Sequence, residues 1–358
     1  MLVTRMHLFD PLALAGVTLR NRIGVSPMCQ YSSNDGHPTS WHLVHLGSRA
    51  VGGAGLVVAE ATAVTAQGRI SRGDSGLWLD SQAEAWAPIA RFISEQGAVA
   101  GIQLAHAGRK ASTDLPWNGG ESVTPEQGGW LPIVAPSEVP FSAKAIVPSA
   151  MTLAEIDATV AAFTSAAQRA LHAGFGLIEI HAAHGYLLHE FLSPLVNQRT
   201  DEYGGSFENR CRFLRRVVAG VRNAMPASVP LLLRISATDW VEGGWDLEQS
   251  CELVAALAGE GVALVDVSSG GAVPGVKIPI GPGYQVGLAA EIRRRTGVPT
   301  AAVGLLTSPE QADQVIRSGQ ADLVLFAREL LRDPYFPRRA ARALGAELTA
   351  PNQYKRAW

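Results

Sequence analysis

Short apolar runs alternate with longer segments of helical periodicity along most of the chain. The short runs are rich in Val, Ile, Leu and Ala, which favours parallel strands that are covered on both faces. The longer segments repeat apolar residues at helical spacing, and some open with a capping box such as Thr152 to Glu155. We predict strands at residues 23–28, 56–59, 99–104, 177–181, 231–235, 263–267, 299–303 and 323–326, and helices at 41–51, 81–95, 153–171, 213–221, 247–257, from 308, and at 334–344.

Eight strands separated by helical segments predict a single (β/α)8 barrel, or TIM barrel, of the α/β class. Parallel strands need crossover connections, and crossovers of one hand close eight such units most simply into a barrel. The length of 358 residues accommodates this fold with insertions, so we expect one domain over residues 1–358. After the third strand the helical pattern is interrupted at residues 107–150, where prolines and glycines recur. We expect this proline- and glycine-rich segment to be a capping insertion over the site.

The composition narrows the class of partner. A formal net charge of -2 and the lack of a basic run argue against a nucleic-acid or membrane-surface partner. The three cysteines, Cys29, Cys211 and Cys251, form no Cys-x-x-Cys pair, which suits a reducing compartment. The N-terminal segment lacks the apolar stretch of a signal peptide, and no run long enough for a membrane span follows. We expect a cytoplasmic protein that acts on a small molecule.

The fourth strand ends in a group of residues that can do chemistry. The apolar run from Leu177 is followed by His181, His184 and Tyr186, and the C-terminal ends of all strands of a barrel face one pocket. The two histidines can donate hydrogen bonds to a substrate oxygen, and the tyrosine can deliver a proton. The same histidines with His189 could instead bind a metal. That alternative is a metal-dependent hydrolase, although the other strands end in Cys, Gln, Arg and Gly.

Other strand ends carry residues that suit a phosphorylated flavin. Gly304 follows the seventh strand and Ala327 with Arg328 follows the eighth, where barrels commonly bind phosphate through backbone N–H groups. Gln103 could hydrogen-bond the pyrimidine edge of a flavin, and Arg234 could stabilise negative charge on the reduced ring. No Gly-x-Gly-x-x-Gly or Walker-type loop is present, so a Rossmann or P-loop unit is not expected.

Longer motifs resemble one family over nearly the whole chain. They are Pro27 to Tyr31 (PMCQY), Gly53 to Leu56 (GAGL), Gln103 to Lys110 (QLAHAGRK), His181 to Tyr186 (HAAHGY), Arg199 to Arg210 (RTDEYGGSFENR) and the tail Tyr354 to Trp358 (YKRAW). These motifs are similar to those of the Old Yellow Enzyme family of FMN-dependent ene-reductases. Cys29 with Tyr31 and the Arg-x-Trp ending resemble the thermophilic-like branch of that family, which includes the xenobiotic reductases.

The resemblance implies an activity and a set of site residues. The family's barrel binds FMN non-covalently, takes hydride from NADPH or NADH, and reduces activated alkenes such as enones, enals, maleimides and nitroalkenes in two half-reactions. Tyr31, His181, His184 and Tyr186 would face the substrate, with Tyr186 as the proton donor. The implied FMN contacts are Pro27, Cys29, Ala61, Gln103, Arg234, Gly304, Ala327 and Arg328.

The resemblance also implies an assembly and shows one departure. In the similar branch an arginine two residues before the C-terminus enters the neighbouring subunit's site. We therefore expect residues 350–358 to be an arm that carries Arg356 to a partner chain, in a homodimer or a dimer of dimers. Ala327 stands where the family often has Gly before the phosphate-binding arginine, and its methyl leaves the backbone N–H available. Cys29 would tune the flavin without a covalent role.

Overall fold

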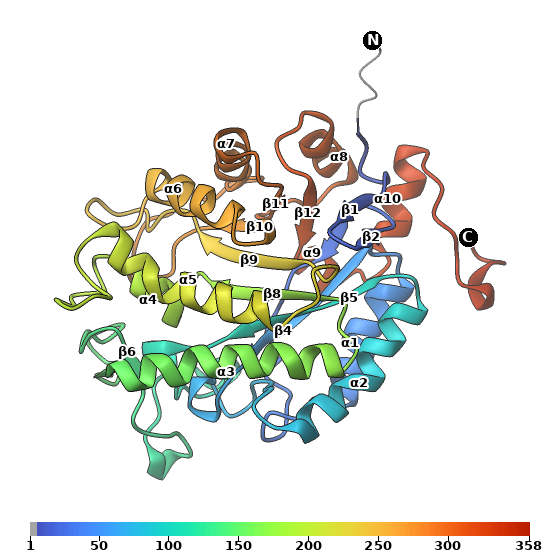
Figure 1. Cartoon of the computed structure of the whole chain (residues 1–358). Helices are drawn as coiled ribbons and strands as arrows, with labels where there is room; N and C mark the ends of the chain where they lie inside the picture. Colours follow the sequence, from blue (N-terminus) through green and yellow to red (C-terminus); the bar gives the residue numbers. More distant parts are fainter. Residues whose placement is uncertain (1–5) are drawn as a thin grey trace.

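Eight parallel strands close into a barrel at the centre of the molecule, with helices around it (Figure 1). This computed structural model describes residues 6–358. Each barrel strand pairs in parallel with the next one along the chain, and the last closes on the first. The strands are β3 (Ile23–Val25), β4 (Leu56–Ala63), β5 (Val99–Ala105), β8 (Leu177–Ala182), β9 (Leu231–Ser236), β10 (Val262–Ser268), β11 (Thr300–Ala302) and β12 (Leu323–Phe326).

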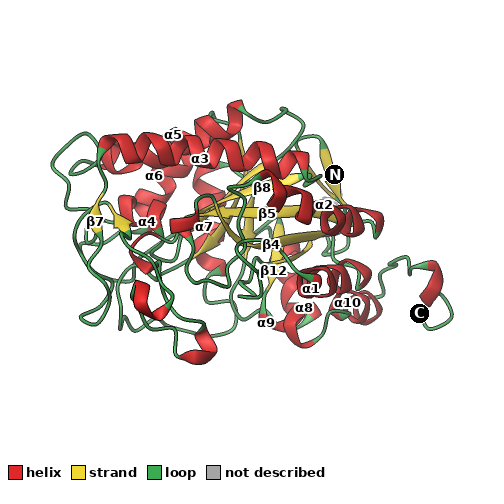
Figure 2. Cartoon of the chain, turned by 90° about the horizontal axis from the view of Figure 1, so that it is seen from below, coloured by secondary structure: helices red, strands yellow, loops and turns green. Residues whose placement is uncertain are grey.

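The predicted (β/α)8 architecture is confirmed, because a helix follows each strand and packs its apolar side on the outside of the barrel (Figure 2). No helix within residues 6–358 is long and apolar enough to cross a membrane. The helices are α1 (Ser40–Val51), α2 (Asp80–Glu95), α3 (Leu153–His172), α4 (Leu187–Leu192), α5 (Phe207–Asn223), α6 (Leu247–Ala258), α7 (Val286–Thr296), α8 (Pro309–Arg317), α9 (Arg328–Arg332) and α10 (Phe336–Leu344).

Several predicted boundaries were wrong, including the start of α5, which begins at Phe207 and not at residue 213. The first strand ends at Val25 instead of residue 28, because Pro27 has no N–H for the ladder. Helix α2 begins at Asp80, one residue before the predicted start at residue 81, and Leu79 is its N-cap residue. The side chain of Gln82, in the first turn, accepts hydrogen bonds at its Oε1 from the backbone N–H groups of Trp78 at 2.8 Å and Leu79 at 3.0 Å, which precede the helix.

A helix and a hairpin are among the elements that the sequence did not predict. Helix α7 covers the barrel after β10, but the run Arg293 to Arg295 masks its short apolar face in the sequence. The N-terminal hairpin pairs β1 (Leu12–Leu14) with β2 (Val17–Leu19). Its buried leucines pack in the same cluster as the leucines inside the barrel, so the hairpin closes the barrel's N-terminal end.

Side chains inside the barrel form an apolar floor with a polar layer above it. Successive residues of a strand point to opposite faces, so every second residue enters the interior. Along β8 these residues are Leu177, Glu179 and His181, in order from the floor to the mouth. The floor contains Leu56, Val58, Leu177, Leu232, Leu264 and Leu323, and the polar layer contains Gln103, Glu179, Arg234 and Asp266.

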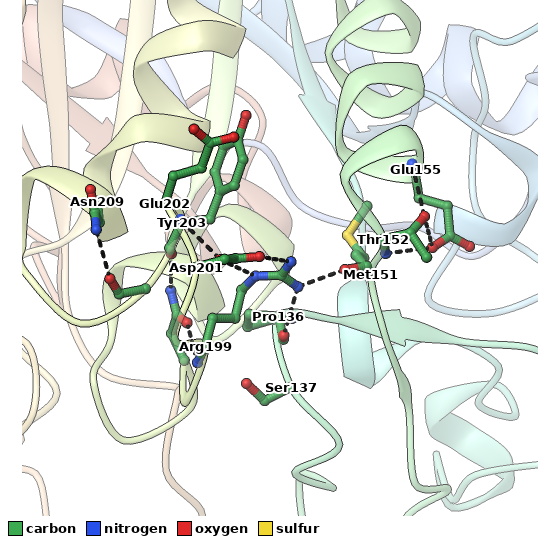
Figure 3. Close-up of polar contacts among 12 residues, drawn as sticks. Pro136, Ser137, Met151, Thr152, Glu155, Arg199, Asp201, Glu202, Tyr203 and Asn209 are labelled. Carbon is green, nitrogen blue, oxygen red and sulfur yellow. Dashed lines mark hydrogen bonds and ion pairs between the residues drawn. The ribbon is translucent and has the colours of Figure 1, made fainter.

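The segment 107–150 follows β5 and is tied down by one arginine (Figure 3). The guanidinium of Arg199 donates to the carbonyl oxygens of Pro136 at 3.1 Å and Met151 at 2.6 Å. Asp201 accepts from the Nε of the same guanidinium at 3.0 Å. The short elements of this segment are η2 (Gly108–Lys110), η3 (Pro116–Asn118), η4 (Pro125–Gln127) and β6 (Val134–Ala135), which pairs with β7 (Ser149–Ala150).

Candidate active site

Three aromatic rings meet at the C-terminal end of β8. The ring centroids of His181 and His184 are 5.1 Å apart, with the ring planes at 79°. The centroids of His181 and Tyr186 are also 5.1 Å apart, with the planes at 68°. Strand alternation directs His181 into the barrel, and the turn that follows brings the other two rings beside it. The structure therefore groups the three residues that the sequence singled out at this strand end.

The turn that carries His184 is held in a left-handed conformation. His184 has a φ of 59° and Gly185 a φ of 71°. The turn packs so closely on the loop after β10 that a Cβ on Gly185 would lie 2.1 Å from the carbonyl oxygen of Gly271. Lys110 secures this contact, because its Nζ donates to the carbonyls of His184 at 2.7 Å and Gly271 at 2.6 Å. These bonds offset a backbone strain of about 1–3 kcal/mol at His184.

Burial sets the protonation state of this cluster. Desolvation and the nearby Arg234 guanidinium lower the pKa of both His181 and His184 well below its ordinary value. Desolvation also raises the pKa of the Tyr186 phenol well above its ordinary value. At neutral pH the imidazoles are uncharged, each with one N–H, and the phenol keeps its proton. The strand end thus presents hydrogen-bond donors and an acid, without a net charge.

The loop after β3 brings Cys29 and Tyr31 to the same mouth. Glu60, buried on β4, accepts a hydrogen bond at 3.0 Å from the N–H of Gln30, which lies between them. Burial and the carboxylates of Asp74 and Glu60 raise the pKa of the Cys29 thiol well above its ordinary value. The thiol is therefore protonated at neutral pH, which does not suit a nucleophile.

Gln103 and Arg234 stand in the polar layer, each beside a carboxylate. The Nε2 of Gln103 donates to Glu179 Oε1 at 2.7 Å. The Nε of Arg234 lies 3.0 Å from Asp266 Oδ2, and its Nη1 lies 3.3 Å from Ser26 Oγ. These contacts use only part of the donors that an amide and a guanidinium carry. The remaining donors are available to a ligand above the layer.

A cavity of about 220 Å³ adjoins this layer at the ends of β11 and β12. Gly304 has a φ of 127°, and a Cβ there would lie 3.0 Å from the Tyr284 ring, so the turn favours glycine. Ala327 has a φ of -103°, which an L-residue adopts without left-handed strain, so its methyl group is accommodated. The cavity is lined by residues that include Arg234, Ser268, Gly304, Ala327 and Arg328.

A second cavity, of about 410 Å³, lies between the barrel mouth and the insertion. Tyr31 and Tyr186 line it from the barrel side, and Phe141 and Lys110 line it from the insertion. The Nζ of Lys110 lies 4.2 Å from the centroid of the Phe141 ring and 5.4 Å from that of Tyr186. The insertion therefore supplies the outer wall of a cavity next to the histidine pair.

His189 does not join His181 and His184, so the structure gives no support to a metal-dependent hydrolase. The Nδ1 of His189 accepts from the N–H of Gly185 at 2.8 Å, and its Nε2 lies 3.0 Å from Asp239 Oδ1. Nδ1 thus has a hydrogen-bond partner, and Nε2 lies beside a buried carboxylate. In the part of the chain that the structure describes, no group of three His, Cys, Asp or Glu side chains is placed to hold a metal ion.

Sequence reasoning did not single out Lys110, Glu179 or Asp266. The alternation of inward residues along β8 was a usable signal for Glu179, since it places this residue between Leu177 and His181. No comparable signal existed for Lys110, because its partners are backbone carbonyls far away in the sequence. Such contacts depend on the tertiary fold and leave no local pattern.

The pocket fits a phosphorylated flavin by its chemistry. The buried Nδ1 of His181 has no hydrogen-bond partner among residues 6–358, as expected of a group that meets a ligand. Gln103 and Arg234 offer donors to the polar edge of a flavin, and the Gly304 turn leaves room for a phosphate. A parallel barrel with this set of donors at its mouth defines the class of flavin-dependent oxidoreductases.

Comparison with known proteins gives the family. Residues 7–347 match the NADH:flavin oxidoreductase / NADH oxidase family, and the chain belongs to it. The chain is 49% identical over 353 residues to an NADPH dehydrogenase of Geobacillus sp. (strain WCH70), covering 98% of each chain. The resemblance found in the motifs is confirmed, and the protein is an FMN-dependent oxidoreductase that uses a nicotinamide reductant.

Solved structures agree with this assignment. The Old Yellow Enzyme homologue from Zymomonas mobilis superposes with a TM-score of 0.79 at 29% identity, covering 96% of this chain and 94% of that one. A 2-naphthoyl-CoA reductase superposes with a TM-score of 0.83 at 27% identity, covering 95% of this chain. The match spans only 52% of that longer reductase, so the shared part is the barrel described here.

Lys110 should make stability depend on pH in the alkaline range. Burial lowers the pKa of its ammonium from 10.5 to about 8 in the folded protein. Between pH 8 and 10.5 the unfolded chain binds the proton and the folded chain does not, so the free energy of unfolding rises with pH. Over this pH range, the free energy of unfolding of wild type, measured with urea, should rise by about 2–3 kcal/mol more than that of Lys110→Met.

An exposed lysine of the same insertion provides the matched control. Lys144→Met should track the wild-type curve at every pH, because Lys144 lies on the surface. If the free energies of unfolding of wild type and Lys110→Met differ by a constant amount from pH 7.5 to 10.5, the lowered pKa is contradicted.

Proposed function

We propose that this protein is an ene-reductase that reduces the C=C bond of activated alkenes such as enones, enals, maleimides and nitroalkenes. The observation that carries the proposal is the neutral pair His181 and His184 with the protonated Tyr186, all three rings in contact at the barrel mouth. Such a group can polarise a carbonyl or nitro oxygen and protonate the adjacent carbon. NADPH or NADH serves as the reductant in a first half-reaction, and the alkene reoxidises the enzyme in a second.

FMN would supply hydride transfer between the nicotinamide and the β-carbon of the alkene. The residues that would hold it are Pro27, Cys29, Ala61, Gln103, Arg234, Gly304, Ala327 and Arg328. His181 and His184 donate hydrogen bonds to the substrate's electron-withdrawing oxygen, which stabilises the enolate-like charge that develops as hydride arrives. Tyr186 gives its phenolic proton to the α-carbon, and Tyr31 lines the substrate cavity.

Two side chains support this arrangement without taking part in bond making. The Oγ of Ser268 lies 2.6 Å from His184 Nε2 and so fixes the orientation of that ring. Cys29, kept protonated by burial, tunes the flavin through polarity and hydrogen bonding. We place the enzyme in the cytoplasm, where nicotinamide reductants are available and cysteines stay reduced.

Replacing both histidines should separate cofactor binding from alkene reduction. In the double variant His181→Ala, His184→Ala, FMN should stay bound while turnover of an enone falls, because each donor is worth about 3–4 kcal/mol in such sites. The flavin absorption band reports binding, and anaerobic alkene turnover reports the chemistry. His172→Ala, on the exposed face of α3, is the control and should behave as wild type. Unchanged turnover in the double variant would refute the assignment.

Tyr186→Phe should slow only the second half-reaction. The substitution keeps the ring beside His181 and removes the proton, so alkene reduction should fall by about 10²–10⁴-fold. Rapid mixing of the reduced enzyme with an alkene measures this step directly. Reduction of the flavin by NADPH in the same variant is the internal control and should be unaffected. A wild-type oxidative rate would show that solvent supplies the proton.

We also propose that the C-terminal arm completes the site of a partner chain. Residues 352–358 are exposed, and the arm leaves the barrel beside α10, away from the insertion at the other end of the molecule (Figure 2). Trp358 remains 51% exposed although it stacks on Tyr335, at 6.2 Å between ring centroids. The arm therefore ends away from the insertion of its own chain, which favours a homodimer or dimer of dimers in which Arg356 reaches a neighbour's pocket.

Removing the arm should affect assembly and catalysis together. Deletion of residues 354–358 should weaken the dimer, measured by sedimentation, and impair alkene turnover. Arg356→Ala should impair turnover while leaving the mass of the assembly unchanged, since it keeps the aromatic residues Tyr354 and Trp358. A truncated protein that stays dimeric with wild-type kinetics would exclude the shared site.

A further inference from the structure

The polar layer of the barrel holds more negative than positive groups. Glu179 and Asp266 are fully buried, and Arg234 is only 6% exposed. Register places these side chains together, since Asp266 pairs with Arg234 across β10 and β9 and Glu179 pairs with Gln103 across β8 and β5. If all three charged groups were ionised, the layer would carry one uncompensated negative charge away from water. Such a charge is costly, so one carboxyl is favoured in its neutral form.

The contacts show which carboxyl that is. Burial raises the pKa of both carboxyls, and neither Asp266 oxygen accepts a hydrogen bond within residues 6–358. Asp266 Oδ2 nevertheless lies 3.0 Å from the Arg234 Nε, so Asp266 has the guanidinium as its counterion. Glu179 accepts only from the neutral amide of Gln103, and its Oε2 has no hydrogen-bond partner within residues 6–358. An ionised Glu179 would therefore leave a charged oxygen without a donor, whereas a neutral acid leaves only a weaker dipole.

We propose that Glu179 is a neutral acid in the oxidised enzyme at neutral pH, and that at alkaline pH it binds a solvent proton when the flavin is reduced, so that it sets the flavin's midpoint potential. The inference rests on the flavin lying over Gln103 and Arg234, and it does not depend on which alkene is the substrate. Glu179 is a positioning residue, because its charge acts on the flavin through Arg234 and Gln103.

A hydride would bring two electrons and one proton to a flavin held over Gln103 and Arg234, and would so add one negative charge to it. That new charge makes ionised Glu179 less favourable, so its carboxylate takes a proton from water, and reoxidation returns the proton. The groups that bear on Glu179 are Asp266 from β10, Arg234 from β9, the Gln103 amide from β5 and the neutral His181 ring on its own strand.

The charges of the polar layer set the pH at which Glu179 ionises, and this pH lies within the range of ordinary measurements. Burial and the neighbouring Asp266 raise the pKa of the Glu179 carboxyl to about 8. Below this pH the acid is neutral before and after reduction and has no effect on the pH dependence. Above this pH, each two-electron reduction takes up one extra proton. The equilibrium constant for reduction then falls by a further factor of ten per pH unit, which lowers the midpoint potential by about 30 mV per pH unit for a two-electron couple.

The test compares midpoint potentials of wild type and Glu179→Gln holoenzymes from pH 6 to 10. Glutamine is the uncharged isostere of the neutral acid, so the two potentials should agree at pH 6. Above about pH 8 the wild-type potential should fall below that of the variant by up to about 30 mV per pH unit. Curves that stay parallel over the range, or that already differ at pH 6, would overturn the proposal.

A matched control and a second readout keep the test decisive. Glu190 is also fully buried, and burial raises its pKa to about 8, but it lies on α4 and accepts from the Arg109 N–H outside the barrel. Glu190→Gln should therefore follow the wild-type curve. If Glu179→Gln fails to retain FMN, infrared difference spectra of wild type decide. Reduction at pH 9 should create a protonated-carboxyl band, and a spectrum without it would refute the proposal whatever the alkene activity.

Discussion

The two-residue period of the parallel strands is the constraint on which the rest of this structure depends. On β8 it sends Leu177 to the floor, Glu179 to the polar layer and His181 to the mouth, while Ile178 and Ile180 pack outward against helices. A slip of one residue would exchange these two sets and turn Ile178 and Ile180 into the barrel interior. Because the strands close into a ring, such a slip would disturb the pairing of β8 with both of its neighbours, β5 and β9.

The mouth depends on a second kind of interaction, between cationic side chains and backbone carbonyls. Arg199 holds the later part of the insertion through the carbonyls of Pro136 and Met151, and Lys110 joins the turn at His184 to the loop at Gly271. Long loops have few apolar contacts of their own, so multidentate cations are an effective way to fix them. The geometry of the mouth is thus set partly by side chains that do not belong to the cluster of His181, His184 and Tyr186.

Much of this arrangement could be predicted from the sequence, because strands buried on both faces and helices with one apolar side leave strong local patterns. The barrel and the grouping of His181, His184 and Tyr186 follow from those patterns and from the rule that strand ends share one mouth. The N-terminal hairpin escaped notice because each of its strands has only three residues. The roles of Lys110 and Asp266 were beyond prediction, since their partners come from distant segments.

Burial keeps the side chains of the mouth largely uncharged and strengthens their hydrogen bonds. Desolvation moves His181, His184, Tyr186 and Cys29 toward their neutral forms, so hydrogen bonds in the cluster are not weakened by water or by counterions. Arg234, paired with Asp266, is the cation of the polar layer and provides a positive field below the mouth. Negative charge that develops on a ligand therefore meets fixed donors and one guanidinium, with no competing mobile charge. The same burial that costs stability is what makes these few dipoles effective.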